Sequence, residues 1–130
     1  MIVVDASALA AALADDDTDG DVARKRLEGE QLAAPEVIDL EIASMLRRKC
    51  RVGAISLQRA LTVLADLQSM RLSRRSHGPL LDRIWELRDN LTPYDAAYVA
   101  LAEDLGATLV TADARLGRAP GARCAIEVLV

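Results

Sequence analysis

The sequence contains no phenylalanine and only three other aromatic residues among its 130 residues. Folds that bind single strands by stacking bases on aromatic side chains need more than this, so we do not expect one. Two cysteines are too few for a disulfide framework and lie too far apart in the sequence for a zinc knuckle. A Ser-His-Asp or Cys-His mechanism would depend on His77, the single histidine, which lies in a predicted loop directly before Gly78 and Pro79.

Long apolar runs are also missing. No uncharged run approaches the ~20 residues that a membrane span requires, and the N-terminus lacks the basic stretch that opens a secretory signal peptide. We therefore expect a cytoplasmic protein without a membrane segment. The length, with 52% hydrophobic and 28% charged residues, predicts one domain that spans residues 1–130.

The charge is distributed unevenly along the chain. The net charge is −4, but residues 45–76 include eight basic residues and one acidic residue, so this segment is net +7 and the remainder is net −11. An acidic site beside a basic segment suits an enzyme that holds a cation and attracts a polyanion. A solvated helical face would give the same pattern.

Short apolar runs alternate with segments of helical periodicity, which predicts an α/β fold. We expect a mostly parallel sheet with helices on both faces. Predicted strands cover residues 2–4, 32–34, 71–73, 108–111 and 125–129. Predicted helices cover residues 7–13, 21–28, 36–49, 57–70, 79–89 and 93–105, with an acidic loop over 15–20 and a turn over 111–115.

Two aspartates follow predicted strands. Asp5 comes directly after the first strand, and Asp113 lies two residues beyond the strand of residues 108–111. Ligand crevices in open α/β sheets form at the carboxyl ends of strands. Each aspartate would also serve as a helix cap or turn residue, so a structural and a functional role both remain open.

Two more carboxylates lie on the apolar faces of predicted helices. At 100° per residue, Glu41 falls within the apolar arc that includes Ile42. Asp95 falls within the arc of Tyr98, although Thr92 and Asp95 also fit a capping box. A carboxylate facing a core is costly unless a cation or hydrogen-bond donors compensate it. We expect the positive end of its helix to keep Asp95 ionised.

Several carboxylates at one sheet edge would repel one another unless a divalent cation joined them. Oxygen ligands without a cysteine or histidine cluster favour Mg²⁺ or Mn²⁺ over zinc. Such ions bind phosphates and lower the pKa of a bound water. The pattern therefore indicates metal-dependent hydrolysis of phosphodiester bonds.

Four short segments occur in a characteristic order: DASAL at residues 5–9, EIASML at 41–46, LTPYDAAYVALA at 91–102 and LVTADARL at 109–116. Together they resemble the PIN-domain ribonucleases, and more narrowly the VapC-type toxins of bacterial toxin–antitoxin pairs. The resemblance covers the whole chain, and the third segment is the most specific of the four.

The resemblance implies an Mg²⁺- or Mn²⁺-dependent endoribonuclease that forms a homodimer and is inhibited by a cognate VapB-type antitoxin. Its metal-binding acidic quartet would be Asp5, Glu41, Asp95 and Asp113, with Glu41 positioning or deprotonating the attacking water. The polar residues that line the same pocket would be Ser7 and Thr111. Candidate contacts to RNA phosphates are Arg47, Arg48, Arg51, Arg74, Arg75 and Arg115.

Alternatives remain open at this stage. A PIN-family nuclease can process RNA without an antitoxin, and a PIN-like module can lose catalysis and only bind a partner. A phosphoacceptor receiver domain has a similar length and acidic strand ends. It also needs a lysine after a late strand, however, and the only lysines are Lys25 and Lys49.

Overall fold

A computed structural model describes residues 1–130. Five strands form one sheet in the order β3-β2-β1-β4-β5, and each neighbouring pair is parallel. The strands are β1 (Ile2–Val4), β2 (Leu32–Pro35), β3 (Ser73–Arg75), β4 (Thr108–Thr111) and β5 (Ile126–Val128). The expected α/β class and parallel sheet are confirmed.

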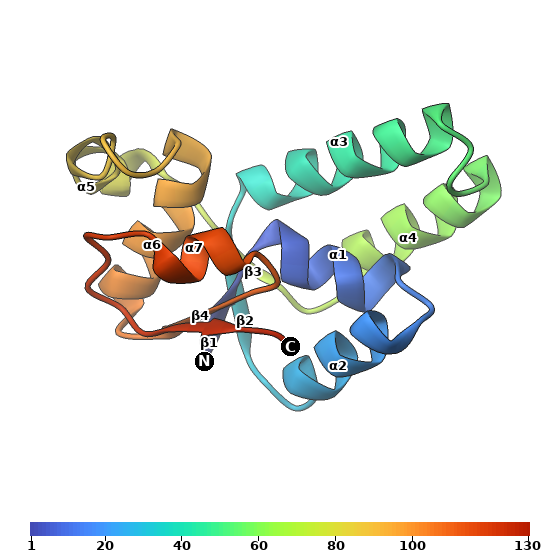
Figure 1. Cartoon of the computed structure of the whole chain (residues 1–130), viewed down its shortest axis with the longest axis horizontal. Helices are drawn as coiled ribbons and strands as arrows, with labels where there is room; N and C mark the ends of the chain where they lie inside the picture. Colours follow the sequence, from blue (N-terminus) through green and yellow to red (C-terminus); the bar gives the residue numbers. More distant parts are fainter.

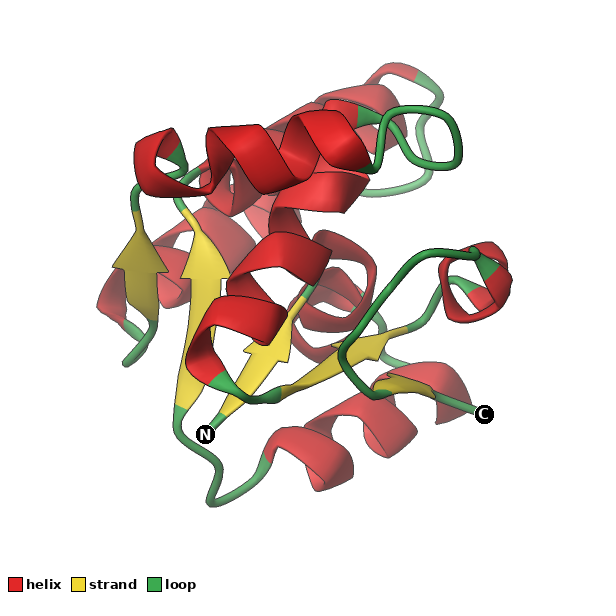
Figure 2. Cartoon of the chain, turned by 90° about the vertical axis from the view of Figure 1, so that its left-hand side faces the viewer, coloured by secondary structure: helices red, strands yellow, loops and turns green.

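Seven α-helices and one short 3-10 helix connect the strands. In Figure 1, α1 to α4 lie on the right and α5 to α7 on the left, with the sheet between them. Figure 2 shows helices above and below the strands. None of the helices has the length and hydropathy needed to cross a bilayer. The helices are α1 (Ala6–Ala14), α2 (Thr18–Leu27), α3 (Val37–Arg51), α4 (Leu57–Ser69), η1 (Gly78–Leu80), α5 (Leu81–Glu86), α6 (Pro93–Leu105) and α7 (Ala114–Arg118).

The order of the strands reverses at β1. From β1 the chain moves outward to β2 and β3, then returns past β1 to β4 and β5. Because right-handed crossovers place the helices of these two halves on opposite faces, a crevice opens where the carboxyl ends of β1 and β4 meet. The register pairs Val4 with Val110, so Asp5 and Thr111 follow side by side.

The two central strands and α6 form the centre of the core. Val3 and Val4 of β1 and Leu109 and Val110 of β4 are fully buried, which is typical of strands covered on both faces. Helix α6 packs against β1, β2 and β4, and residues 96–102 along it are all buried. A helix that is apolar on all sides belongs inside a fold, so α6 is a fixed element on which a site can be built.

Several predicted boundaries were wrong. Helix α2 begins inside the expected acidic loop, β3 begins two residues later than expected, the helix expected over residues 79–89 divides into η1 and α5, and α7 replaces an expected turn. For α2 the reason is a close contact with the end of α1. A Cβ at Gly20 would lie 1.8 Å from the carbonyl oxygen of Asp15, and hydrophobic periodicity does not report a packing contact of this kind.

Candidate active site at the carboxyl ends of the central strands

Asp5 lies at the end of β1 and is almost fully buried. Its Oδ1 accepts hydrogen bonds from the Ala8 backbone N–H at 3.0 Å and from Ser7 Oγ at 2.7 Å, while Oδ2 accepts one from the Thr111 hydroxyl. Asp5 therefore caps α1 and also faces the crevice, so the structural and functional interpretations are compatible.

The surroundings of Asp5 make its charge costly. Burial raises the pKa of Asp5, and the charge of Asp95 raises it further, against the hydrogen bonds from Thr111, Ala8 and Ser7. All three donors are neutral, and no arginine or lysine forms an ion pair with Asp5. The folded chain leaves this buried carboxylate without a positive partner.

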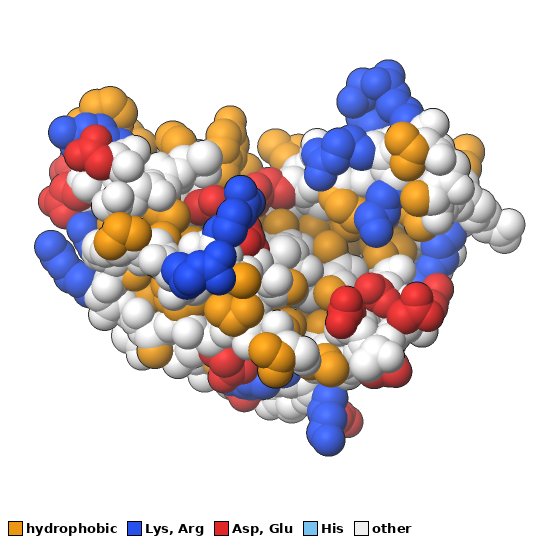
Figure 3. All heavy atoms as spheres, viewed as in Figure 1, with side chains coloured by type: hydrophobic (Ala, Val, Ile, Leu, Met, Phe, Trp, Pro, Cys, Tyr) orange, Lys and Arg blue, Asp and Glu red, His pale blue; other side chains and the backbone are white.

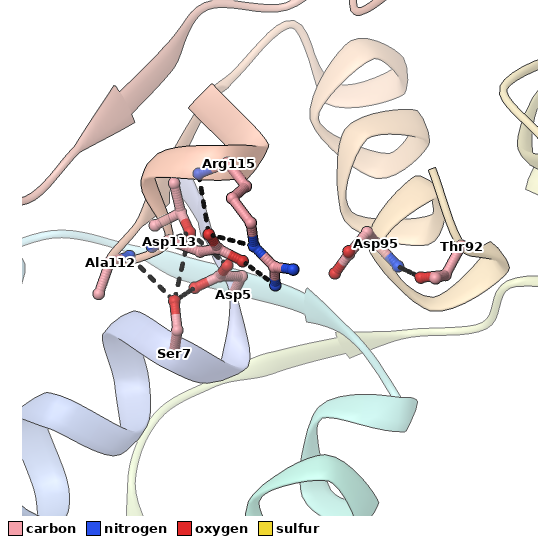
Figure 4. Close-up of polar contacts among 8 residues, drawn as sticks. Asp5, Ser7, Thr92, Asp95, Ala112, Asp113 and Arg115 are labelled. Atoms are coloured by element: carbon pink, nitrogen blue, oxygen red, sulfur yellow. Dashed lines mark hydrogen bonds and ion pairs between the residues drawn. The ribbon is translucent and has the colours of Figure 1, made fainter. Parts of the chain in front are cut away.

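Two hydroxyl groups tie the ends of β1 and β4 together. Ser7 Oγ lies 3.2 Å from Thr111 Oγ1 and accepts a hydrogen bond from the Ala112 backbone N–H at 2.9 Å. Thr111 Oγ1 accepts one from the Asp113 backbone N–H at 3.0 Å. Figure 4 shows Ser7 beside Asp5 and the loop after β4. Ser7 and Thr111 thus lie where the sequence predicted them.

Glu41 lies on α3 and is half-buried. The hydroxyl of Tyr98, on α6, donates a hydrogen bond to Glu41 Oε1 at 2.5 Å. Burial raises the pKa of Glu41 against this hydrogen bond, and the charges of Asp95 and Asp5 add to the rise. The expected inward orientation of Glu41 is found, and its partner Tyr98 belongs to the apolar arc that the sequence predicted for the helix of Asp95.

Asp95 lies in the first turn of α6, and Thr92 is the N-cap of this helix. Thr92 Oγ1 accepts a hydrogen bond from the Asp95 backbone N–H at 3.2 Å. The helix N-terminus favours a charged carboxylate, yet the pKa of Asp95 is raised, because burial and the charge of Asp113 outweigh the charge of Arg115. Burial and Asp113 therefore oppose the favourable position of Asp95 at the helix N-terminus.

Asp113 differs from the other three carboxylates because it has a cationic neighbour. It caps α7 by accepting a hydrogen bond from the Arg115 backbone N–H at 2.9 Å, and the Arg115 guanidinium contacts its carboxylate at 3.1 Å. These hydrogen bonds hold the pKa of Asp113 below its ordinary value. Figure 4 shows the Arg115 side chain reaching into the space between Asp113 and Asp95.

The acidic quartet therefore gathers at one edge of the sheet, and three of its four members have a raised pKa. No group of three carboxylate, cysteine or histidine side chains is arranged closely enough to hold one metal ion. The all-oxygen donor set fits Mg²⁺ or Mn²⁺ by its chemistry. Figure 3 shows acidic and basic side chains at the floor of a notch in the surface.

The predicted RNA-contacting arginines divide into two groups. Arg47, Arg48 and Arg51 are exposed on α3 and take part in no ion pair. Arg74, by contrast, binds both carboxylate oxygens of Asp39 at 2.7 and 2.9 Å and also donates to the Leu67 carbonyl. Arg74 therefore joins β3 to α3 and α4, and its guanidinium is engaged there rather than free for an RNA phosphate, contrary to the sequence prediction. Arg75 and Arg115 remain exposed.

Comparisons with known proteins agree with this fold. The family model of the PIN domain matches residues 2–122. Ribonuclease VapC9 of Mycobacterium tuberculosis is 47% identical over 99% of this chain and 98% of its own, and ribonuclease VapC1 of the same organism is 40% identical over 98% and 96%.

Solved structures with the same fold include two that match nearly the whole chain. PAE2754 from Pyrobaculum aerophilum matches with a TM-score of 0.70 and 31% identity over 98% of this chain and 83% of its own. VapBC2 from Rickettsia felis, bound to a DNA fragment from its promoter, has the same fold with a TM-score of 0.74 and 17% identity over the full length of both chains.

A parallel sheet with an acidic crevice at its topological switch, matched by this family model, defines a PIN-domain protein. Given near-full-length identity of 40% or more to VapC relatives, the chain belongs to the VapC family of PIN domains.

Proposed function

We propose that the chain is a Mg²⁺- or Mn²⁺-dependent endoribonuclease and the toxin of a toxin–antitoxin pair in the cytoplasm. The observation that carries this proposal is the gathering of four carboxylates at the carboxyl ends of the central strands, where Asp5 is buried without a cationic partner. These carboxylates repel one another, and burial and this repulsion raise the pKa of three of them. A bound divalent cation would remove that repulsion and supply the charge that phosphodiester hydrolysis needs. The names of the VapC relatives support the ribonuclease activity.

The residues of the crevice would divide the work. The metal-binding quartet of Asp5, Glu41, Asp95 and Asp113 would hold the ion directly or through water, and Glu41 would also orient or deprotonate the attacking water. A divalent cation held by these residues would supply positive charge for the phosphate and for the attacking water. Burial and the neighbouring acids raise the pKa of Glu41, and a carboxylate with a raised pKa is a stronger proton acceptor than a free one.

Arginines at the edge of the crevice would bind the substrate. Arg115 has a side chain that is 84% exposed, so its contact with Asp113 is screened by water and is exchanged at little cost for an RNA phosphate. Arg47, Arg48 and Arg51 extend the positive surface along α3, and Arg75 lies at the end of β3. Because these contacts go to the backbone, RNA affinity should fall steeply as the salt concentration rises.

Exposed apolar side chains support a protein partner. Leu81, Trp85 and Tyr94 are between 59% and 65% exposed, and Leu81 and Tyr94 line an apolar cavity of ≈ 260 Å³. Surfaces of this kind commonly mark interfaces, and we assign this one to the homodimer. Sedimentation velocity of the purified chain measures the dimer directly.

The cognate VapB-type antitoxin would cover the crevice, and co-purification with the product of a neighbouring gene would identify it.

The nuclease proposal is tested by incubating the protein with total cellular RNA and Mn²⁺, with EDTA as the metal-free control. We expect discrete cleavage that is lost in EDTA and lost in Asp5→Asn. If wild type and Asp5→Asn cleave equally, the acidic quartet is not the active site. If neither cleaves, and Mn²⁺ does not raise the melting temperature of the wild type, the chain is a binding module without catalysis.

A further inference from the structure

Tyr98 is a fully buried side chain with one polar atom. It is 1% exposed and lies in the run of α6 that packs on the sheet. A buried phenol needs a hydrogen-bond partner, and the Glu41 carboxylate is the partner it has. The polar atom of this core residue is therefore directed at the acidic quartet rather than at the backbone.

The Tyr98–Glu41 hydrogen bond joins two halves of the fold. Glu41 belongs to α3, which packs with α1 and α4, whereas Tyr98 belongs to α6, which packs with the sheet and α5. Asp95 lies one turn before Tyr98 on α6, and residues three apart share a face of a helix. The bond thus links the helix that carries Asp95 to the side chain of Glu41 across the crevice.

The phenol is well suited to hold a carboxylate in place without competing for it. Its ring is fixed by the core, so its hydroxyl has a defined position, and it brings no positive charge that would replace a cation. Glu41 has no other side-chain hydrogen bond or ion pair, and it is half-exposed at the edge of the crevice. Without the phenol, its flexible side chain would have several orientations open to it.

We propose that Tyr98 is a positioning residue, which holds the Glu41 carboxylate at a fixed place relative to Asp95 so that both serve one divalent cation. This inference rests on the proposed metal site. The competing explanation is that Tyr98 only fills the core. Phenylalanine fills the same space, so Tyr98→Phe removes the hydroxyl and leaves the packing unchanged.

The test measures the affinity of the purified full chain for Mn²⁺ alone, by isothermal titration without RNA. We expect Tyr98→Phe to weaken binding about tenfold, the range found when partners of metal ligands are removed. Val63→Ala is the matched control, because Val63 is fully buried in α4, which bears no member of the quartet. It should lower the melting temperature and leave Mn²⁺ affinity unchanged.

A double-mutant cycle separates positioning from packing. In a Glu41→Ala background the phenol has no carboxylate to hold, so Tyr98→Phe should cause no further loss of Mn²⁺ affinity. In the Glu41→Ala background, Tyr98→Phe should also raise the melting temperature, since it removes an unsatisfied buried hydroxyl. In the wild-type background, Tyr98→Phe should lower the melting temperature, since it breaks the hydrogen bond to Glu41.

The outcomes distinguish this inference from the proposed function. If Asp5→Asn and Glu41→Ala weaken Mn²⁺ binding but Tyr98→Phe does not, the positioning role is overturned and the metal site stands. An equal loss from Tyr98→Phe in both backgrounds also overturns it. If none of these variants changes Mn²⁺ binding, the metal site itself is wrong.

Discussion

The two ends of α6 each carry a carboxylate, and the fold treats them in opposite ways. Asp95, in the first turn, has a pKa raised by burial and by Asp113. Glu103, in the last turn, is also subject to burial, but hydrogen bonds from the Arg83 guanidinium and the Arg123 backbone N–H outweigh it and lower its pKa. The helix dipole alone would produce the reverse order.

This difference separates a carboxylate that the fold pairs with a cation, Glu103, from one whose charge is opposed by its surroundings, Asp95. Glu103 accepts bonds from Arg83 at 2.7 and 3.1 Å, and Arg83 also donates to the Gly121 carbonyl. The pair fastens the loop before β5 to α6 and has no capacity left for a ligand. Asp95 shares its end of the helix with other acids, so its charge is left for a ligand to compensate.

The largest expected effect is on RNA cleavage. Asp95→Asn should reduce cleavage more than about 100-fold, because loss of an ion ligand removes several kcal/mol of transition-state stabilisation. Glu103→Gln should leave the rate within about twofold. Initial rates on one RNA in saturating Mn²⁺ measure both. Equal losses from the two variants would mean that the two ends of α6 do not differ in function.

The two variants should affect the free energy of unfolding in the reverse order, with the larger loss in Glu103→Gln. Glu103→Gln should lower the free energy of unfolding by about 2 kcal/mol, since it leaves the largely buried Arg83 with weakened partners. Asp95→Asn should raise the free energy of unfolding in EDTA, by a smaller amount, because it removes an uncompensated charge. Urea unfolding followed by circular dichroism gives both values. A stability loss from Asp95→Asn in EDTA would show that its charge is already compensated within the chain.

The smallest expected effect is on the pH dependence of stability in EDTA. A raised folded-state pKa means that the folded chain binds more protons, so the contribution of Asp95 falls as pH rises above the ordinary value of 3.8. Glu103, with a lowered pKa, contributes stability above 4.5 that is lost as pH falls below it.

Unfolding curves between about pH 3 and pH 7 separate these two contributions. Asp95→Asn should reduce the decline toward neutral pH, and Glu103→Gln should reduce the decline toward acid. Identical pH profiles for the two variants would contradict the opposite pKa shifts.

The sequence predicted the quartet because its members occupy positions that periodicity and strand ends reveal. Asp5 follows an apolar strand, and Glu41 falls on an apolar helical face, so both could be located from one chain. The sequence did not predict which side chains would pair with one another. Tyr98 and Glu41 are 57 residues apart, and Arg74 and Asp39 are 35 apart, so their pairing depends on how helices pack rather than on local pattern.

Short elements were also beyond local pattern. Helix α7 has five residues, too few for periodicity to distinguish a helix from a turn. The sequence identified Asp113 as a capping candidate. It did not predict that Arg115 lies beside the crevice, because that position depends on the formation of α7. The missing information was therefore tertiary, and it concerned the partners of charged groups.

The position of β1 in the centre of the sheet also determines when the crevice comes into existence. β1 is made first, yet its partner β4 is made about a hundred residues later, and the register joins Ile2 to Thr108. At about 5 to 20 residues per second of synthesis, several seconds or longer pass between the synthesis of β1 and that of β4. Asp5 then has no Thr111, Asp95 or Asp113 beside it, so the crevice does not exist until β4 has been made and has paired with β1.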